Sequence, residues 1–273
     1  MTAPERETAY AKINLALHVR ARRADGYHEI ETLFAFAQDG DVLEGVLADD
    51  VSLSVSGAYG GALQGETDNL VLRAANALRK AFGIAEGVAF RLDKRLPVAA
   101  GVGGGSADAA AAMRLLSRLW NLDSSSPEFM AIARDLGADV PACIASRTCF
   151  GHGRGDALKP HRDASLEGTP LLLVNPLIPL STAAVFAGWN GEDRGALDPS
   201  DWRTGRNDLE LPAIGLVPEI GTLLGDLAAQ RGAKFVRMSG SGATCFALFD
   251  TSENCAAAGD ALSRFWTMRT AIR

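Results

Sequence analysis

The sequence predicts an α+β fold. Three observations support this prediction: a strand-like alternation near the N-terminus, a helical pattern over residues 69–82, and further strands and helices without a regular βα order. A doubly wound parallel sheet needs that regular order and therefore fits less well. With 273 residues, the chain is long enough for one large domain or two modest lobes.

The first third of the chain reads mainly as strands. Residues 9–20 alternate between apolar and polar side chains, which predicts a half-buried strand. Its apolar face holds Ile13, Leu15, Leu17 and Val19, and its polar face holds Lys12, Asn14 and His18. A turn is expected at ADGYH (24–28), followed by strands over HEIETLFAFA (28–37) and VSLSVS (51–56).

The middle of the chain reads mainly as helices. A helix over 69–82 is expected to be capped by Asp68 or Thr67 and to stop at Gly83, with a strand over 87–96 next. After a glycine-rich loop, helices are expected over 107–120, from Ser126-Pro127 to Gly137, and within 137–145. Residues 150–165 then read as loop, which suggests two lobes, 1–158 and 159–273.

The last part mixes both element types. We expect strands within 171–175, in the segment 234–250 and over 265–272, and helices from Thr182, over 216–231 and before the last strand. The polar stretch 188–208 lies among them. Residues 170–189 carry no charge but contain three prolines, so a buried strand, a turn and a helix start are expected there instead of a membrane span.

Charge and cysteine content exclude several classes of function. The net charge is −6, and the one dense basic cluster is Arg20, Arg22 and Arg23, which reads as a solvated loop, so no nucleic-acid partner is expected. Cys143, Cys149, Cys245 and Cys255 form no CxxC pair, which disfavours a zinc site and a disulfide framework. The N-terminus has no apolar core typical of a signal peptide, so a cytoplasmic location is expected.

Residues 97–109, PVAAGVGGGSADA, place four glycines in five positions before a helix. Glycines let backbone N–H groups approach a phosphate, and a helix N-terminus favours an anion. The P-loop pattern fails because Ser106 stands where its second glycine belongs and no lysine follows. The dinucleotide pattern fails at Ser106 too, and Asp123, at the spacing of its acidic residue, follows a predicted helix instead of a strand.

A third kind of phosphate loop fits better. Residues 97–110 resemble the second motif of the galactokinase, homoserine kinase, mevalonate kinase and phosphomevalonate kinase superfamily, and the triple glycine most resembles its 4-diphosphocytidyl-2-C-methyl-D-erythritol kinase family. Other segments match that family in order, over nearly the whole chain: AYAKINLALHV (9–19), RADGYHEIETLF (23–34), LGADVP (136–141) and MSGSGATCFALF (238–249).

The resemblance implies a two-lobed α+β fold, with the active site in the cleft between the lobes. The first lobe would carry the ATP loop and the catalytic residues, and the second would complete the substrate site. The implied activity is ATP-dependent phosphorylation of the 2-hydroxyl of 4-diphosphocytidyl-2-C-methyl-D-erythritol, a step of non-mevalonate isoprenoid synthesis, with Mg²⁺ as cofactor. The alternatives are a superfamily kinase for another substrate, such as homoserine or mevalonate, and a catalytically silent nucleotide-binding regulator.

The resemblance also implies a role for each site residue. Lys12 and Asp139 match the catalytic pair: Asp139 would accept or orient the hydroxyl proton, and Lys12 would stabilise developing charge. The residues that would surround ATP are Pro97, Val98, Ala99, Ala100, Gly101, Val102, Gly103, Gly104, Gly105, Ser106 and Ala107. Those that would bind the cytidyl substrate are Asn14, Tyr27, His28, Thr182 and Phe186.

Several of these positions have plainer interpretations. Ser106 or Asp139 could simply cap a helix, Lys12 could face solvent, and Phe186 could be a core residue of a helix. Ala107-Asp108 stands where other members carry Ser-Asn, which argues against a side-chain phosphate contact at 107. No glutamate matches the magnesium ligand of mevalonate kinases, so no residue is assigned to a metal. The protein is expected to be a monomer or a weak homodimer, without a membrane partner.

Overall fold

The computed structural model describes residues 4–63, 68–98 and 100–273. They form two compact units that interleave along the chain. The first unit comprises the described residues within 4–11, 39–98 and 103–146, and the second those within 12–38, 100–102 and 147–273. We had predicted consecutive lobes that meet at residue 158, and the assignment of functional lobes to those ranges stays a prediction.

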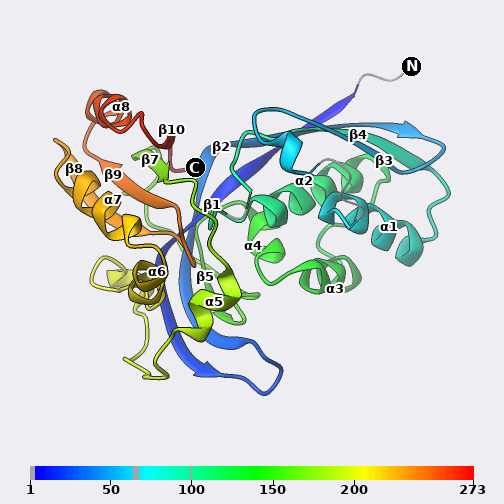
Figure 1. Cartoon of the computed structure of the whole chain (residues 1–273). Helices are drawn as coiled ribbons and strands as arrows, with labels where there is room; N and C mark the ends of the chain where they lie inside the picture. Colours follow the sequence, from blue (N-terminus) through cyan, green and yellow to red (C-terminus); the bar gives the residue numbers. More distant parts are fainter. Residues whose placement is uncertain (1–3, 64–67, 99) are drawn as a thin grey trace. The chain divides into compact units, whose positions relative to one another are not determined.

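The first unit combines a small sheet with four helices. Strand β4 (Gly87–Asp93) pairs antiparallel with the end of β2 (His28–Ala48) and parallel with β3 (Ser52–Ser56). The helical segments are η1 (Gly60–Leu63), α1 (Leu70–Phe82), α2 (Gly104–Leu119), α3 (Pro127–Leu136) and α4 (Val140–Ala145). Within this unit, Figure 1 shows α1, α2 and α3 gathered on one side of β3 and β4.

Local sequence signals account for most of these helix ends. The side chain of Asn69 caps α1 by accepting the N–H of Val71, so the expected cap at Asp68 is wrong, and Thr67 lies outside the described residues. Gly83 ends α1 in the left-handed conformation at φ +65°, as predicted. Ser126 caps α3 as expected, with Pro127 at its first position.

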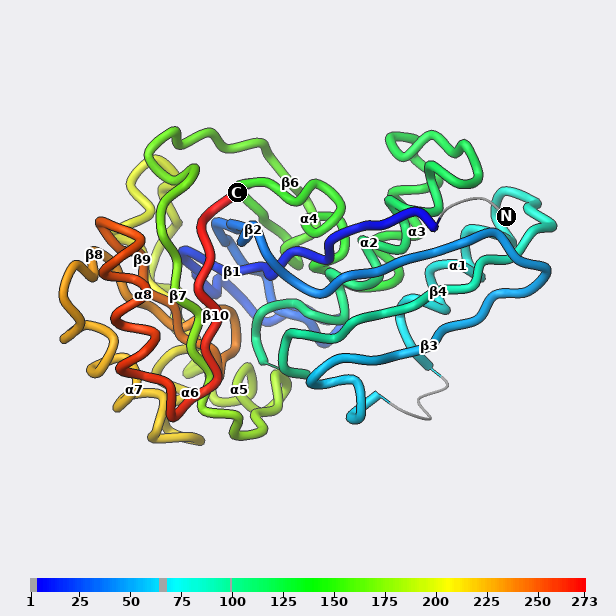
Figure 2. Tube along the Cα trace, turned by 90° about the horizontal axis from the view of Figure 1, so that it is seen from above, coloured from blue at the N-terminus to red at the C-terminus, as the bar shows by residue number. Residues whose placement is uncertain are grey.

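The second unit contains a four-stranded antiparallel sheet in the order β10-β7-β9-β8, which Figure 2 shows from above. Its strands are β7 (Pro170–Asn175), β8 (Ala233–Met238), β9 (Cys245–Phe249) and β10 (Trp266–Ala271). The helical segments of the unit are α5 (Thr182–Ala187), η2 (Pro199–Asp201), α6 (Glu210–Leu216), α7 (Glu219–Ala228) and α8 (Ser252–Ala261). Apolar residues of α7 and α8 pack with those of β7 and β9 in one core.

Two parts of this unit differ from the predictions. The segment expected as loop at 150–165 contains the antiparallel strands β5 (Cys149–Gly153) and β6 (Ala157–Pro160), and β5 also pairs with the start of β2. The helix expected over 216–231 is confirmed as α7, which is three residues shorter at each end, whereas α6 lies before it in a segment where no helix was predicted. The chain breaks between them at Val217 and Pro218 because a proline in a helix interior removes a hydrogen bond.

Strand β1 (Glu5–Arg22) is longer and more deeply buried than predicted. Its residues 11–19 are all buried, including the polar side chains of Lys12, Asn14 and His18. The prediction of a half-buried strand is therefore wrong: both faces of β1 are covered, so its polar face must find protein partners. All four cysteines are buried thiols, and no helix in the described ranges is long and apolar enough to cross a membrane.

Candidate active site

Helix α2 begins inside the glycine loop, three residues earlier than predicted. Gly103 precedes it in the left-handed conformation at φ +66° and offers no capping side chain. The first N–H groups of a helix, here those of Gly104, Gly105 and Ser106, lack acceptors within the helix. Together with the positive end of the helix dipole, they make this turn suited to an anion such as a phosphate.

Ser106 is the third residue of α2, so the expectation that it caps the helix is wrong. Its surroundings include the segment that leads into α4. A Cβ atom added to Gly137 would lie 3.8 Å from the Ser106 hydroxyl oxygen. The GADVP segment therefore begins beside the first turn of α2.

Asp139 directly precedes α4 and is partly exposed. Although it occupies the capping position, its side chain makes no capping hydrogen bond to the helix. The plainer interpretation of Asp139 as a helix cap is therefore wrong, and its carboxylate is not used to start α4.

Arg114 of α2 holds the other end of α4. Its Nη1 donates to the carbonyl oxygen of Cys143 at 2.5 Å and to the hydroxyl of Ser146 at 3.0 Å, while its Nε pairs with Glu7 at 3.0 Å. These bonds satisfy groups at the C-terminal end of α4, which a helix leaves without internal partners. Sequence reasoning missed Arg114, because an arginine in a helix does not reveal its partners.

In the second unit, Lys12 and Asn14 lie side by side on β1. Lys12 is 4% exposed, and its ammonium donates to Asn14 Oδ1 at 2.9 Å and lies 5.1 Å from the centre of the Phe34 ring. Asn14 Nδ2 donates to the hydroxyl of Thr32 at 2.8 Å, and that hydroxyl donates to the Ala16 carbonyl at 2.7 Å. The expectation of a shared face is confirmed, and the interpretation of Lys12 as a solvent-facing residue is wrong.

Ser239 links the first and second motifs. Its hydroxyl oxygen accepts the backbone N–H of Asn14 at 3.3 Å and donates to the Gly101 carbonyl at 3.1 Å. A Cβ atom at Gly101 would lie 2.3 Å from the Gly242 carbonyl oxygen, and Gly101 has φ +76°. Only glycine therefore fits at position 101, on grounds of both space and conformation.

Hydrogen bonds also fix Ala100, the residue before Gly101. The Ala100 carbonyl accepts from the hydroxyl of Thr244 at 2.5 Å, from its backbone N–H at 3.1 Å and from Asn175 Nδ2 at 3.4 Å. The first part of the glycine loop is thus held by the segment that follows β8. Ala99 lies outside the described residues, Val102 is buried, and Pro97 and Val98 enter the loop, with Val98 43% exposed.

The loop after β8 is itself held by Asn207. Its Nδ2 donates to the Met238 and Gly240 carbonyls at 2.9 and 2.8 Å. Across the loop, the Ser241 hydroxyl lies 2.9 Å from that of Thr182, the candidate substrate residue at the start of α5. Asn207 therefore has a structural role in holding this loop.

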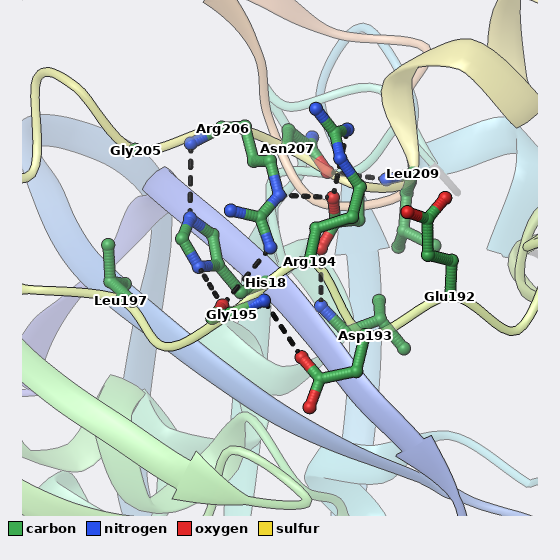
Figure 3. A network of polar contacts seen from close by, with 12 residues as sticks. His18, Glu192, Asp193, Arg194, Gly195, Leu197, Gly205, Arg206, Asn207 and Leu209 are labelled. Carbon is green, nitrogen blue, oxygen red and sulfur yellow. Dashed lines mark hydrogen bonds and ion pairs between the residues drawn. The ribbon is translucent and has the colours of Figure 1, made fainter.

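A polar network joins this region to β1, as Figure 3 shows. The Arg206 N–H donates to Nε2 of His18 at 3.2 Å, while Nδ1 of His18 lies 3.0 Å from the Gly195 carbonyl oxygen. One nitrogen must therefore accept and the other donate, which assigns the neutral ring with its proton on Nδ1. Burial lowers the pKa of His18, and nearby Arg206 adds to that shift, in agreement with a neutral ring.

The ADGYH turn presents Tyr27 at the surface. Tyr27 is 50% exposed, and the Arg154 guanidinium lies 5.0 Å from the centre of its ring. The turn is closed by the N–H of Arg23, which donates to the Tyr27 carbonyl, and Gly26 has φ +84°. Tyr27 therefore offers an aromatic face on a fixed turn.

The ring of His28 packs against Phe186 of α5, with centroids 4.8 Å apart, and against the edge of Trp189 at 5.7 Å. Arg22 donates to the Trp189 carbonyl at 2.8 Å. Burial, and then the charge of Arg22, lower the pKa of His28, so its ring is neutral at pH 7. Phe186 is partly buried against the core, so it has the plainer packing role as well as a place beside His28.

Two family models match the chain: GHMP kinases N terminal domain over residues 69–147, and GHMP kinases C terminal over 192–267. A solved 4-(cytidine 5'-diphospho)-2C-methyl-D-erythritol kinase has a TM-score of 0.83 at 34% identity, covering 98% of this chain and 99% of that one. The homoserine kinase from Cytophaga hutchinsonii shares the fold at a TM-score of 0.69 and 16% identity, covering 96% of this chain and 95% of its own.

The predicted α+β fold is confirmed, and the fold with its glycine loop defines a small-molecule kinase of the ATP-dependent GHMP class. The 4-diphosphocytidyl-2-C-methyl-D-erythritol kinase of Rhizorhabdus wittichii is 53% identical over 98% of this chain and 94% of its own length. That of Sphingopyxis alaskensis is 48% identical over the full length of both. The chain belongs to the 4-diphosphocytidyl-2-C-methyl-D-erythritol kinase family.

Proposed function

We propose that this kinase transfers the γ-phosphoryl group of ATP to the 2-hydroxyl of 4-diphosphocytidyl-2-C-methyl-D-erythritol, within non-mevalonate isoprenoid synthesis. Besides the family membership, the main support for this substrate is the ADGYH turn. Tyr27, which is half exposed, and the neutral His28 are consecutive residues of this turn. The ring of His28 packs on Phe186. This is a set of groups suited to a neutral, planar base.

The ATP end of the reaction is assigned to the start of α2. Backbone N–H groups of Gly104, Gly105 and Ser106 would bind the phosphates, and the residues from Pro97 to Val102 and Ala107 would surround the nucleotide. Ser106 adds a hydroxyl at that turn. The fixed carbonyls of Ala100 and Gly101 support this assignment because a loop held in advance loses less entropy when a nucleotide binds.

The chemical step needs position and charge more than covalent help from the protein. The substrate oxygen forms a bond to the γ-phosphorus, the bond to the β-phosphate oxygen breaks, and ADP leaves. Asp139 orients the hydroxyl and accepts its proton, and the Lys12 ammonium stabilises charge that develops during transfer. Two findings support these roles: Asp139 is partly exposed at the residue before α4, and Asn14 fixes the Lys12 ammonium.

The substrate end is assigned to five residues. Tyr27 and Phe186 would offer stacking surfaces for the cytosine ring, and His28 would read the edge of the base. Asn14 and Thr182 would bind polar groups of the substrate. The contact of Thr182 with Ser241 supports an ordered hydroxyl at that point.

A magnesium ion would arrive with ATP and neutralise charge on the phosphates. Among the described residues, no cluster of three or more His, Cys, Asp or Glu side chains could enclose a metal ion. We propose that phosphate oxygens and water hold this ion, because Mg²⁺ keeps several waters in kinase sites. The cytoplasmic location and the monomeric or weakly dimeric state stay predictions.

A substrate panel tests this proposal. ADP release should be measured with 4-diphosphocytidyl-2-C-methyl-D-erythritol, homoserine and mevalonate at equal concentrations. We expect turnover with the first and at least about a hundredfold lower kcat/KM with the others, since an unfilled base site forfeits its binding energy. Faster turnover of homoserine or mevalonate would reassign the substrate, and ATP binding without turnover on any of them would support the silent regulator.

A further inference from the structure

Three charged side chains form a buried cluster beneath the start of α2. The ammonium of Lys94 lies 2.5 Å from Asp41 Oδ2 and 2.7 Å from Asp108 Oδ2. All three residues are at most 4% exposed. Lys94 follows β4, Asp41 comes from β2 and Asp108 from the second turn of α2, and none of them has a part in the proposed reaction.

The two carboxylates are not equally satisfied. Asp41 Oδ1 accepts the backbone N–H groups of Arg95 and Leu96 at 2.6 and 2.8 Å, and its Oδ2 accepts Lys94. Asp108 Oδ2 accepts Lys94 as well, but Oδ1 of Asp108 is buried without a hydrogen-bond partner among the described residues. Of the two carboxylates, Asp108 is therefore the one whose charged form is costly.

The cluster lies close to the proposed phosphate site. A Cβ atom added to Gly104, the first residue of α2, would lie 3.1 Å from Lys94 Nζ. When both carboxylates are ionised, one cation faces two anions, and the net charge of −1 opposes an incoming phosphate. When Asp108 carries a proton, the cluster is neutral, and this repulsion disappears.

We propose that Asp108 takes up a proton when a nucleotide's phosphates bind at the first turn of α2, an inference that rests on the proposed function. The proton comes from solvent and resides on the Asp108 carboxyl group, while Lys94 and Asp41 stay ionised. Burial raises the pKa of Asp108 to about 7, against the opposing effect of Lys94, so the proton is exchangeable near neutral pH. Nucleotide binding and proton binding then favour each other.

The other elements packed on α2 bring few charges to this cluster. From β2 and the segment after β4, the groups that act on Asp108 are Asp41 and Lys94. Further along α2, Arg114 faces Glu7 of β1. On the side of α4, Asp139 precedes the helix. On the side of α1, Asp68 pairs with Arg73 and is mostly exposed.

Calorimetry of ADP binding with excess Mg²⁺ tests the proposal directly. Titrations at pH 7 in buffers of different ionisation enthalpy give the number of protons taken up. We expect about half a proton per ADP for the natural chain, because a group with a pKa near 7 is half ionised there. Asp108→Asn keeps an oxygen for Lys94 but cannot titrate, so its uptake should fall to that of the nucleotide alone.

The pH dependence of affinity gives a second, independent measurement. The Kd for ADP of the natural chain should rise by up to about tenfold from pH 6 to pH 8, and that of Asp108→Asn should stay nearly constant. Asp93→Asn, which removes a partly exposed carboxylate of the same unit, serves as the matched control and should behave like the natural chain.

The possible failures are distinguishable. ADP binding with equal proton uptake in the natural chain and in Asp108→Asn would overturn this inference and leave the proposed function intact. If Asp108→Asn does not fold, a flat Kd of the natural chain from pH 6 to pH 8 would overturn the inference by itself. Absence of any ADP binding to the natural chain would overturn both the inference and the assigned nucleotide site.

Discussion

The Lys12 ammonium donates a hydrogen bond to Asn14 Oδ1 across 2.9 Å, on a strand that is buried on both faces. A buried cation needs a fixed partner, and Asn14 is in turn held by Thr32. The position of the proposed catalytic lysine therefore depends on a threonine that takes no part in the reaction.

Thr32→Val should expose this dependence. Valine matches threonine in shape but removes the hydroxyl that serves Asn14 and the Ala16 carbonyl, so we expect a loss of about 1–3 kcal/mol in the free energy of unfolding. With Asn14 no longer oriented, kcat should fall by about tenfold. Denaturant melts and steady-state kinetics measure both effects. Thr32→Ser, which keeps the hydroxyl, should preserve kcat, and an equal loss in both variants would contradict the account.

Asp139→Asn should remove the acceptor of the hydroxyl proton. We expect kcat to fall by about 10²- to 10⁴-fold with ADP affinity nearly unchanged, as general-base roles typically contribute that much. Rapid-quench kinetics and ADP titration separate the two quantities. Asp135→Asn, at an exposed site on α3, is the control and should be silent. If Asp139→Asn retains the natural rate, Asp139 has no role in the chemistry.

His28 should set a pH limit on substrate binding. Its pKa is lowered by burial and by Arg22, so the neutral ring persists below its usual pKa of about 6.5. At saturating ATP, the kcat/KM for the diphosphocytidyl substrate should be constant from pH 8 to about pH 6.5 and fall only below that. Arg22→Gln removes a repelling charge and should move this fall to higher pH. A fall that stays in place or moves to lower pH would contradict the assignment.

Two glycines of the ATP loop should respond oppositely to alanine. At Gly101, φ is +76° and the added Cβ would overlap the Gly242 carbonyl, so Gly101→Ala should cost about 1–3 kcal/mol of stability. At Gly105, inside α2, the added Cβ would lie 3.5 Å from a Leu70 side-chain carbon, and alanine should stabilise by up to about 1 kcal/mol. Thermal melts measure the two changes in stability. Equal shifts of Tm in the two variants would contradict the described loop conformation.

Local signals predicted much of the fold. The sequence patterns predicted the ends of two helices to within one residue: α1, between Asn69 and Gly83, and α3, between Ser126 and Gly137. The hairpin of β5 and β6 was missed because its glycines and charged residues suggested a loop. Helix α6 was also missed, because its seven residues include Pro212 and Gly215, which are unfavourable inside helices.

The sequence motifs of the site could be predicted, but the hydrogen bonds between distant segments could not. The resemblance named Lys12, Asn14 and Gly101, but nothing local to them points to Ser239, which links two of them from 225 residues beyond Asn14. The burial of Lys12 could not be predicted locally either, because segments distant in sequence cover the polar face of β1. Arg114 and Asn207 act through backbone carbonyls, which leave no pattern in a sequence.

The central claim is that phosphate is placed on one particular hydroxyl of one particular substrate, and phosphorus NMR of the product tests it most directly. The 2-position is a tertiary carbon–oxygen centre, so the product made from ¹³C-labelled 4-diphosphocytidyl-2-C-methyl-D-erythritol should show a new phosphomonoester coupled to the carbon that bears the methyl group. We expect this signal together with the release of one ADP per product molecule. A phosphomonoester whose two-bond coupling is to a different carbon, or ADP release without a new phosphomonoester, would contradict it.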